Sequence, residues 1–287
     1  MIDFQNVSFS YGEESSGGGI RNVNLTINTG EFVLLTGESG CGKTTITRLV
    51  NGLVPHYYEG NLEGDVLLDG KSVSDTPLYD LAAMVGSVFQ NPKSQFFNVD
   101  TDSELAFACE NLGYPQEDIL KRIDRTVSDY HIEDLMGRSV FALSGGEKQK
   151  IACASSSVLL PGIMVLDEPS SNLDMAAIDD LRQVLSLWKK QGKTILIAEH
   201  RLYYLHDLAD RVLYVKDGEI EREYTPAEFD SLSDGTRKEM GLRPFSLSKL
   251  KPANQYQAHT AKHMEFQNFC FAYKKREPES LHIPSAE

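Results

Sequence analysis

The sequence predicts an α/β fold with three parts: a core built on a parallel sheet, an N-terminal antiparallel β-subdomain and an inserted α-helical subdomain. Short, wholly apolar runs such as residues 163–166 indicate buried parallel strands, and segments with helical spacing separate them. Residues 2–11 instead alternate apolar and polar side chains, as a half-buried strand does. Residues 101–137 are polar and helix-prone, which predicts the helical insertion.

One glycine-rich loop in the core indicates nucleotide binding. Residues 37–44, the phosphate loop, read Gly-Glu-Ser-Gly-Cys-Gly-Lys-Thr and fit the pattern G-x-x-x-x-G-K-[ST] at every required position. The apolar run 31–36 before the loop predicts a buried strand, and residues 45–51 after it have helical spacing and end at Gly52. This order of strand, loop and helix predicts the core of a P-loop NTPase.

The residue types of the loop suit the chemistry of phosphate. Glycines let backbone N–H groups approach the oxygens, and the N-terminus of the following helix adds unpaired donors and partial positive charge. Lys43 supplies a mobile cation for the β- and γ-phosphates, and the Thr44 hydroxyl can ligate Mg²⁺. The loop residues expected to bind the nucleotide are Gly37, Ser39, Gly40, Cys41, Gly42, Lys43, Thr44 and Thr45.

Composition narrows the possible functions. The net charge is −14 with acids and bases interspersed, which argues against nucleic-acid binding because that would need a basic stripe. The four cysteines lie far apart without a C-x-x-C pair, so neither a metal site nor a disulfide framework is expected, and a reducing cytosol is indicated. Cys41 could be a redox target, but a small residue filling a loop position is the simpler interpretation. No signal peptide or apolar run of 18 residues is evident, so the chain is not expected to span a membrane by itself.

The N-terminal strands come first along the chain. After the strand 2–11 and a polar loop, residues 20–28 predict the returning strand, and residues 65–68 predict a third. Tyr11 stands at the end of the first strand, where an aromatic ring can stack on an adenine base. A surface tyrosine that stacks on nothing is the alternative.

A strand at residues 84–89 leads from the core into the helical insertion. It ends in Gln90-Asn91-Pro92, and the segment Ser94-Gln95-Phe96-Phe97 that follows is aromatic. Such an aromatic patch is usually part of a core, but it can also be a docking surface. The helices predicted beyond it span residues 102–111, 116–130 and 132–136.

A second glycine pair marks the start of the next helix, residues 148–160. The preceding segment, 143–147, reads Leu-Ser-Gly-Gly-Glu, and two glycines at a helix N-terminus make an anion site. An ordinary N-cap serine followed by a flexible turn is the alternative.

Acidic residues follow the apolar strand 163–166. A buried parallel strand delivers Asp167 and Glu168 at its carboxyl end, where doubly wound sheets place their chemistry. Asp167 would hold Mg²⁺, and Glu168 would orient or deprotonate the attacking water. The strand 194–198 ends at Glu199-His200 on the same sheet edge. A lone histidine there is usually structural, but a γ-phosphate contact is the functional alternative.

The remaining core elements follow directly. Residues 170–174 cap a helix over 175–190, and a closing hairpin is predicted over residues 211–215 and 219–224.

Taken together, these motifs resemble the nucleotide-binding subunit of an ATP-binding cassette (ABC) transporter. The resemblance covers residues 1–242, in which seven family motifs occur in the family's order. They are the adenine-stacking Tyr11, the Walker A loop 37–44, the Q-loop Gln90, the signature 143–147, Walker B 163–168, the D-loop 171–174 and the switch His200.

The resemblance implies ATP and Mg²⁺ as cofactors and assigns a role to each motif residue. The implied catalytic residues are Lys43, Glu168 and His200. The implied metal ligands are Thr44, Gln90 and Asp167. Besides the phosphate loop, the implied nucleotide contacts are Tyr11, Gln90, Ser144, Gly145, Gly146, Glu147 and Asp174.

Within the family, two segments are most similar to the energy-coupling factor (ECF) group: residues 89–92 with Gln95, and residues 198–202. The resemblance implies an ATPase that drives uptake of vitamins, vitamin precursors, cobalt or nickel. Its partners would be separate integral membrane subunits and no nucleic acid, and its place would be the cytoplasmic face of the cell membrane.

A repeat predicts how the domains are organised. Residues 264–273 match residues 2–11 at five of ten positions, which indicates the beginning of a second cassette. The chain is therefore interpreted as the first half of a tandem two-cassette protein. The predicted parts are a cassette over 1–242 with a helical subdomain at about 92–160, a linker over 243–263, and the truncated start of the second cassette over 264–287.

In this family two cassettes pair head to tail, and ATP on one phosphate loop is covered by the partner's Ser144-Gly145-Gly146. The partner would be the second cassette or a second copy of the chain. One alternative is a soluble tandem ABC protein acting on the ribosome or on nucleic acid, which the acidic charge and short linker disfavour. Another is a regulatory cassette that binds ATP without hydrolysis, which Glu168 and His200 disfavour.

Overall fold

The computed structural model describes residues 1–12, 18–245, 266–271 and 281–286. The chain divides into two compact units, Met1–Ser248 and Lys249–Glu287. In the described ranges, no helix is long and apolar enough to cross a membrane.

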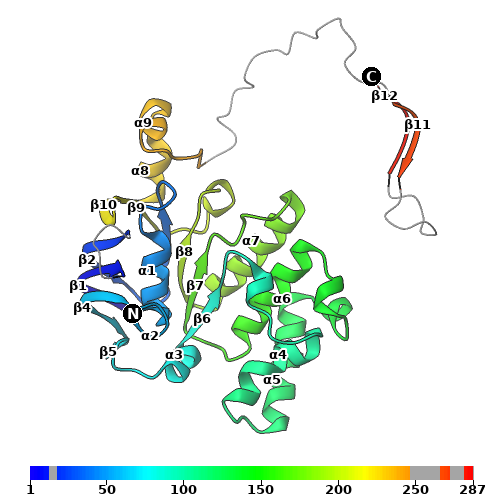
Figure 1. The fold of residues 1–287 in the computed structure, drawn as a ribbon, viewed down its shortest axis with the longest axis horizontal. Helices are drawn as coiled ribbons and strands as arrows, with labels where there is room; N and C mark the ends of the chain where they lie inside the picture. Colours follow the sequence, from blue (N-terminus) through cyan, green and yellow to red (C-terminus); the bar gives the residue numbers. More distant parts are fainter. Residues whose placement is uncertain (13–17, 246–265, 272–280, 287) are drawn as a thin grey trace, which may run out of the picture. The chain divides into compact units, whose positions relative to one another are not determined.

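The core of the first unit is a six-stranded sheet in the order β10-β9-β3-β8-β7-β6 (Figure 1). All neighbouring pairs are parallel except β10 with β9. The strands are β3 (Phe32–Thr36), β6 (Val85–Val88), β7 (Ile163–Asp167), β8 (Thr194–Ala198), β9 (Arg211–Lys216) and β10 (Glu219–Tyr224). The predicted parallel core is confirmed, and the carboxyl ends of β3, β7 and β8 share one edge of the sheet.

The central strands are apolar almost throughout because both of their faces are covered. In β3, Phe32 and Leu34 belong to the hydrophobic cluster that includes α6 (Gly145–Ser157) and α7 (Met175–Lys190). Val33 and Leu35 belong to a second cluster, formed with α1 (Lys43–Val50) and the N-terminal strands. Side chains of a strand alternate between its faces, so a strand packed on both sides is apolar at nearly every position; β3 and β8 each contain one buried threonine, Thr36 and Thr194.

The N-terminal strands form the predicted antiparallel sheet, in the order β2-β1-β4-β5. These strands are β1 (Ile2–Tyr11), β2 (Gly19–Ile27), β4 (Gly60–Leu68) and β5 (Lys71–Ser72). Strand β4 begins earlier than the predicted 65–68, because residues 60–63 pair with the second half of β1. Its first half is partly or fully exposed and carries no alternation that the sequence could reveal. Two short helices follow the phosphate-loop helix: α2 (Leu53–His56) and α3 (Leu78–Met84).

The helical insertion contains α4 (Thr101–Asn111) and α5 (Gln116–Tyr130), which pack with α6 (Figure 1). Tyr130 joins the insertion to the core, since its hydroxyl donates to Ser157 Oγ at 2.5 Å and accepts from the indole of the fully buried Trp188. The helix predicted over 132–136 is wrong; a single 3₁₀ turn, Glu133–Leu135, stands there. Further 3₁₀ turns are Pro92–Ser94, Val140–Ala142 and Tyr203–Leu205. The unit closes with α8 (Pro226–Ser231) and α9 (Asp234–Glu239).

The second unit holds a two-stranded antiparallel sheet of β11 (Phe266–Phe271) and β12 (Leu281–Ala286). Its strand β11 lies within the predicted repeat of β1. Asn268 has a positive φ of 45° and Asn6, its counterpart in the repeat, one of 51°. The repeat's Tyr273 and residues 246–263 of the predicted linker lie outside the described residues.

Candidate functional site

The phosphate loop connects β3 to α1 in a conformation that requires its glycines. Gly37, Gly40 and Gly42 have φ values of +147°, +80° and +111°. A Cβ at Gly37 would lie 2.1 Å from the carbonyl oxygen of Val215 on β9. The loop is therefore pressed against the end of the core sheet, and its glycines are required for both conformation and space.

Lys43 is the first residue of α1, where the phosphate loop enters the helix. Its side chain is buried, and its ammonium donates to the carbonyl oxygens of Gly37 at 3.0 Å and Glu38 at 2.8 Å. The loop thus curves around the cation, which is the arrangement that presents positive charge to bound phosphate.

Two of the predicted metal ligands lie side by side. The Thr44 hydroxyl at the start of α1 donates to Asp167 Oδ1 at the end of β7, at 3.1 Å. The pKa of Asp167 is raised, mainly because the carboxyl group is buried, and the charge of Glu168 raises it as well. The hydrogen bond from Thr44 and the charges of Arg48 and Lys43 act in the opposite direction. A hydroxyl and a carboxylate are the hard oxygen donors that Mg²⁺ prefers, so these two residues fit the predicted metal site.

Glu168 lies where the strands β6, β7 and β8 end. Its Oε2 accepts from Gln90 Nε2 at 3.1 Å, and its Oε1 lies 3.1 Å from His200 Nε2. Glu168 has a positive φ of 45°, and its amide donates to the carbonyl oxygen of Ala198 on β8 at 2.8 Å. The structure therefore brings together the predicted base, the Q-loop glutamine and the switch histidine.

Gln90 contacts the carboxylate of Glu168 here rather than the Thr44–Asp167 pair. Burial and the Lys43 ammonium lower the pKa of His200, whereas Glu168 and Glu199 raise it. A neutral imidazole can still donate from Nε2 to an acceptor such as the Glu168 carboxylate.

Glu199 is a buried acidic residue beside the candidate site, and the sequence alone assigned it no role. Its carboxylate is 1% exposed and accepts from the amides of Ser170, His200 and Arg201 and from the hydroxyl of Tyr204. It fixes the backbone of the loop that carries His200 and ties that loop to the segment after β7. The signal in the sequence is an acidic residue directly after five wholly buried strand positions.

The signature segment forms the start of α6, three residues before the predicted helix. Ser144 is the N-cap: its hydroxyl accepts from the amide of Glu147, whose carboxylate in turn accepts from the amide of Ser144 at 2.7 Å. The Glu147 side chain also pairs with Arg138 at 2.9 Å. Its carboxylate is therefore a capping group in this structure, although nucleotide contact was predicted for it.

The second signature glycine, Gly146, faces α7. A Cβ at Gly146 would lie 2.7 Å from the Cβ of Ala177, so the helices approach closely only because this residue is glycine. Among the described residues, no hydrogen bond joins residues 144–147 to the phosphate loop. One copy of the chain therefore does not bring the two halves of the predicted ATP site together by direct contact.

Two other residues predicted to contact the nucleotide make hydrogen bonds within the chain. The Asp174 carboxylate caps α7 by accepting from the amide of Ala177 at 2.9 Å. The Tyr11 hydroxyl lies 3.3 Å from Thr45 Oγ1 and accepts from Arg48 at 3.1 Å. Tyr11 is thereby held beside the start of α1, next to the phosphate loop.

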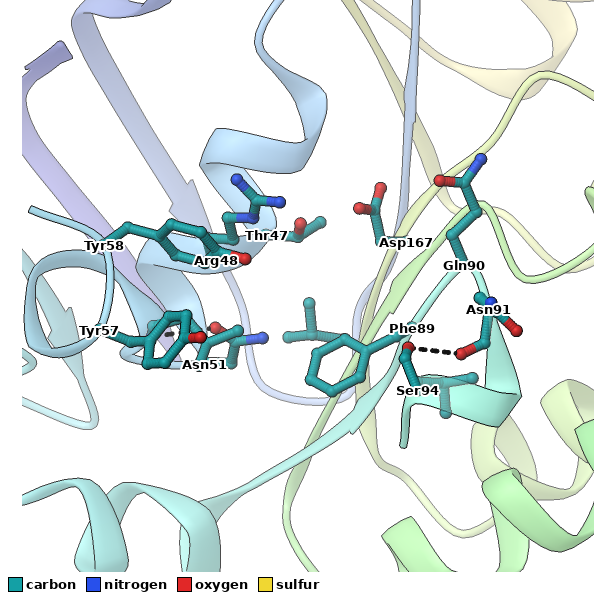
Figure 2. A pocket seen from close by; sticks show the side chains of 13 residues that line it. Thr47, Arg48, Asn51, Tyr57, Tyr58, Phe89, Gln90, Asn91, Ser94 and Asp167 are labelled. Atoms are coloured by element: carbon teal, nitrogen blue, oxygen red, sulfur yellow. Dashed lines mark hydrogen bonds between the residues drawn. The ribbon is translucent and has the colours of Figure 1, made fainter. Parts of the chain in front are cut away.

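A pocket of about 480 Å³ opens between α1 and the end of β6 (Figure 2). Asp167 and Gln90 lie on one side of it and Arg48 on the other, with the guanidinium of Arg48 4.0 Å from the centre of the Tyr58 ring. Phe89 and its neighbours at the start of the helical insertion form a further part of the wall, together with residues on and just after α1 such as Asn51 and Tyr57. The pocket thus connects the sheet edge that carries Asp167 to the surface around Gln90.

The ABC transporter family model matches residues 20–171, more than half of the chain. This chain belongs to the ABC transporter family. The match runs from β2 through the phosphate loop, the signature and Walker B to the first residue of the D-loop. Members are ATP-hydrolysing cassettes, and the family's cofactors are ATP and Mg²⁺. The predicted fold class and cofactors are confirmed.

Relatives of known sequence belong to the same family. An ABC transporter ATP-binding protein of Treponema denticola is 47% identical over 251 residues, which cover 88% of this chain and 51% of that protein. The ABC transporter ATP-binding protein PYRAB03730 of Pyrococcus abyssi is 40% identical over 229 residues, covering 79% of this chain and 81% of that protein. The chain thus spans about half the length of the first relatives that it matches.

Solved ABC cassettes have the same fold. The structure of cbiO1 from Clostridium perfringens, described as part of the ABC transporter complex cbiONQ, matches with a TM-score of 0.71 and 27% identity over 83% of this chain and 93% of that one. The cassette MJ0796, solved as a dimer bound to ADP and phosphate, matches with a TM-score of 0.68 and 26% identity over 79% of this chain and 99% of that one.

Proposed function

We propose that this chain is the ATP-hydrolysing cassette of a membrane importer of the ECF type, at the cytoplasmic face of the membrane. Its solute would be a vitamin, a vitamin precursor or a transition-metal ion. The observation that supports ATP hydrolysis is the position of Glu168, which contacts Gln90 and His200 beside the Thr44–Asp167 pair. The similarity to cbiO1, which is part of a transporter complex, supports the proposal that this chain also works in a transporter.

In the proposed mechanism, Lys43 and the loop amides bind the β- and γ-phosphates. Bound Mg²⁺ would neutralise phosphate charge, and Thr44 and Asp167 would hold it. Glu168 would accept a proton from the attacking water, since its carboxylate lies at the open end of β7. His200 would orient Glu168 and contact the γ-phosphate, because its Nε2 already lies 3.1 Å from that carboxylate.

Two cassettes would complete each site. The signature helix N-terminus is an anion-binding group, but its contacts lie in the helical insertion and α7 rather than at the phosphate loop of the same copy. We propose head-to-tail pairing with the second cassette of the same protein. The match to half of the Treponema denticola relatives and the repeat of β1 in β11 support a tandem protein. Solved dimers of MJ0796 support pairing of cassettes.

An exposed apolar surface beside the Q-loop would receive the membrane subunit. It consists of Phe97, Val99 and Phe141, whose exposed fractions are 75%, 63% and 76%. These residues line a pocket of about 300 Å³ together with Lys93 and Lys148. Of the aromatic pair predicted at this place, Phe97 is exposed and stacks on Phe107, whereas Phe96 packs against the core. Phe97 follows Gln90 by seven residues, and an exposed cluster of aromatic side chains fits an apolar helix of a partner.

Affinity purification of the full-length protein from detergent-solubilised membranes tests this function. We expect integral membrane proteins to co-purify, and the double variant Phe97→Ser/Phe141→Ser to lose them. Leu120→Ser, which changes another exposed apolar residue (52% exposed) on α5, should retain them. Ribosomal proteins or nucleic acid in place of membrane subunits would instead support the soluble tandem alternative. A cross-linking map that leaves residues 90–100 untouched would reject the proposed surface.

A further inference from the structure

The segment after α9 lies against the phosphate loop. We call residues 240–245 the C-terminal strap. The Tyr214 hydroxyl donates to the carbonyl oxygen of Met240 at 3.2 Å, and a Cβ at Gly241 would lie 2.7 Å from Cγ of Glu38. Glu38 is the loop residue whose carbonyl accepts from Lys43 at 2.8 Å. One end of the strap is therefore anchored beside the phosphate-binding cation, at the end of the core where Figure 1 shows α9 above α1.

The other end of the strap is anchored near the switch histidine. Phe245 is fully buried, and its ring lies 5.2 Å from that of Phe229 on α8 and 4.9 Å from that of His206. His206 directly follows the 3₁₀ turn 203–205 in the loop that begins at His200. The strap thus runs from the phosphate loop to the His200 loop, and Arg243 stands between its two anchors.

Arg243 presents an available positive charge at this place. Its side chain is exposed, and within the described ranges it makes no hydrogen bond or ion pair. Its charge nevertheless acts in the surroundings of His200: burial and then Lys43 lower the pKa of that imidazole most, and Arg243 adds a smaller lowering effect. Two cations from opposite ends of the chain therefore act on the residue expected at the γ-phosphate.

We propose that Arg243 is a nucleotide-binding residue whose guanidinium contacts the γ-phosphate of ATP bound to the same copy of the chain. A guanidinium can donate two parallel hydrogen bonds to phosphate oxygens. The strap's two anchors keep its backbone near the site, so little ordering is required on binding. Because the γ-phosphate is present in ATP and absent in ADP, Arg243 distinguishes the two nucleotides.

The experiment compares nucleotide binding by the full 287-residue chain with and without Arg243. Equilibrium binding of fluorescent ATP and ADP is measured with Mg²⁺ in a Glu168→Gln background, which prevents turnover. We expect Arg243→Ala to weaken ATP binding about three- to tenfold, the effect of one solvent-exposed charge-assisted contact, and to leave ADP binding within about twofold. Arg243→Lys should be intermediate, because a point charge retains attraction without the paired geometry.

Lys238→Ala is the matched control, since it removes one exposed positive charge from neighbouring α9 and should leave both affinities unchanged. The inference rests on ATP binding at the phosphate loop, which the proposed function also requires. A parent protein that binds no ATP would therefore refute the proposed function and the Arg243 contact together. A parent that binds ATP while Arg243→Ala binds it equally well refutes the Arg243 contact alone. Equal weakening of ATP and ADP also refutes it. Unchanged affinity with weaker self-association would assign Arg243 to the partner cassette instead.

Discussion

Oε1 of Glu168 lies 3.1 Å from Nε2 of His200, although the two residues follow different strands of the core sheet. The pair forms because β7 and β8 are adjacent and parallel, with Asp167 opposite Ala198 in register. Both strands therefore end at the same edge, where Glu168 directly follows β7 and His200 lies two residues after the end of β8. Gln90, which follows the neighbouring β6, completes the group from the other side.

Glu168→Gln should separate nucleotide binding from hydrolysis. The amide keeps the size of the side chain but cannot accept a proton from water, so turnover should fall about 100- to 1,000-fold while ATP still binds. Steady-state phosphate release and equilibrium ATP binding measure the two properties. Glu110→Gln on α4, exposed and distant from the sheet edge, is the control and should hydrolyse ATP normally. Near-normal turnover in Glu168→Gln would remove Glu168 from the role of base.

Lys43→Ala should weaken nucleotide binding itself. The ammonium is held by two loop carbonyls and is the nearest cation to the expected phosphates, so its loss should raise the Kd for ATP about 10- to 100-fold. Titration with a fluorescent ATP analogue measures the change. Lys71→Ala removes an exposed lysine of the N-terminal sheet and should bind like the parent. Equal affinity in the two variants would show that phosphate is bound elsewhere.

Glu199→Gln should lower both stability and turnover. The buried carboxylate accepts from three amides and a hydroxyl, whereas a glutamine offers one acceptor oxygen and turns an NH₂ group toward donors. We expect the free energy of unfolding to fall by about 2–3 kcal/mol. Turnover should fall about tenfold, because His200 loses its fixed backbone.

Urea unfolding and phosphate release at a temperature where the variant remains folded measure these two effects. Glu239→Gln, at an exposed position of α9, serves as the control. A stable variant with full activity would mean that the His200 loop is held by other contacts.

The pH dependence of stability should report on His200. Its pKa is lowered from 6.5 by burial and Lys43, so below pH 6.5 the unfolded chain binds a proton that the folded site resists. His200 thus contributes its full stabilisation above pH 6.5 and loses it as the pH falls toward the folded pKa. In His200→Gln this loss should be absent, so the stability difference from the parent should shrink on acidification. Urea unfolding of both proteins between about pH 5.5 and 7.5 tests this; a constant difference would argue against the lowered pKa.

ATP should drive weak self-association of the chain. Each copy carries a phosphate loop and a signature segment, so two copies can complete two sites even without a second cassette. We expect Glu168→Gln with Mg²⁺ and saturating ATP to dimerise at about 10–50 µM, because hydrolysis cannot reopen the pair. Sedimentation velocity measures the dimer. The double variant Lys43→Ala/Glu168→Gln should remain monomeric. If Glu168→Gln alone also stays monomeric, the cassette pairs only with its native partner.

Several elements could be predicted because their signals are local. The phosphate loop, the acidic end of β7 and the signature each lie within eight consecutive residues, and their glycines and acids have physical reasons to stand there. The parallel core strands could be recognised because burial on both faces leaves them almost wholly apolar. The first half of β4 could not, since its exposed side chains follow no alternation, and residues 132–136 are too short a segment to distinguish a helix from a 3₁₀ turn.

Amino-acid pattern alone was enough to establish the ABC cassette, its α/β fold and the residues at the ends of its strands. Which of those residues touch one another depended on the order of strands in the sheet, which no short segment encodes. The contacts of Glu168 with Gln90 and His200, the donors around Glu199 and the strap beside Glu38 each join residues from separate elements. Such contacts arise when burial of apolar faces brings distant segments together, so they are visible only in the folded chain.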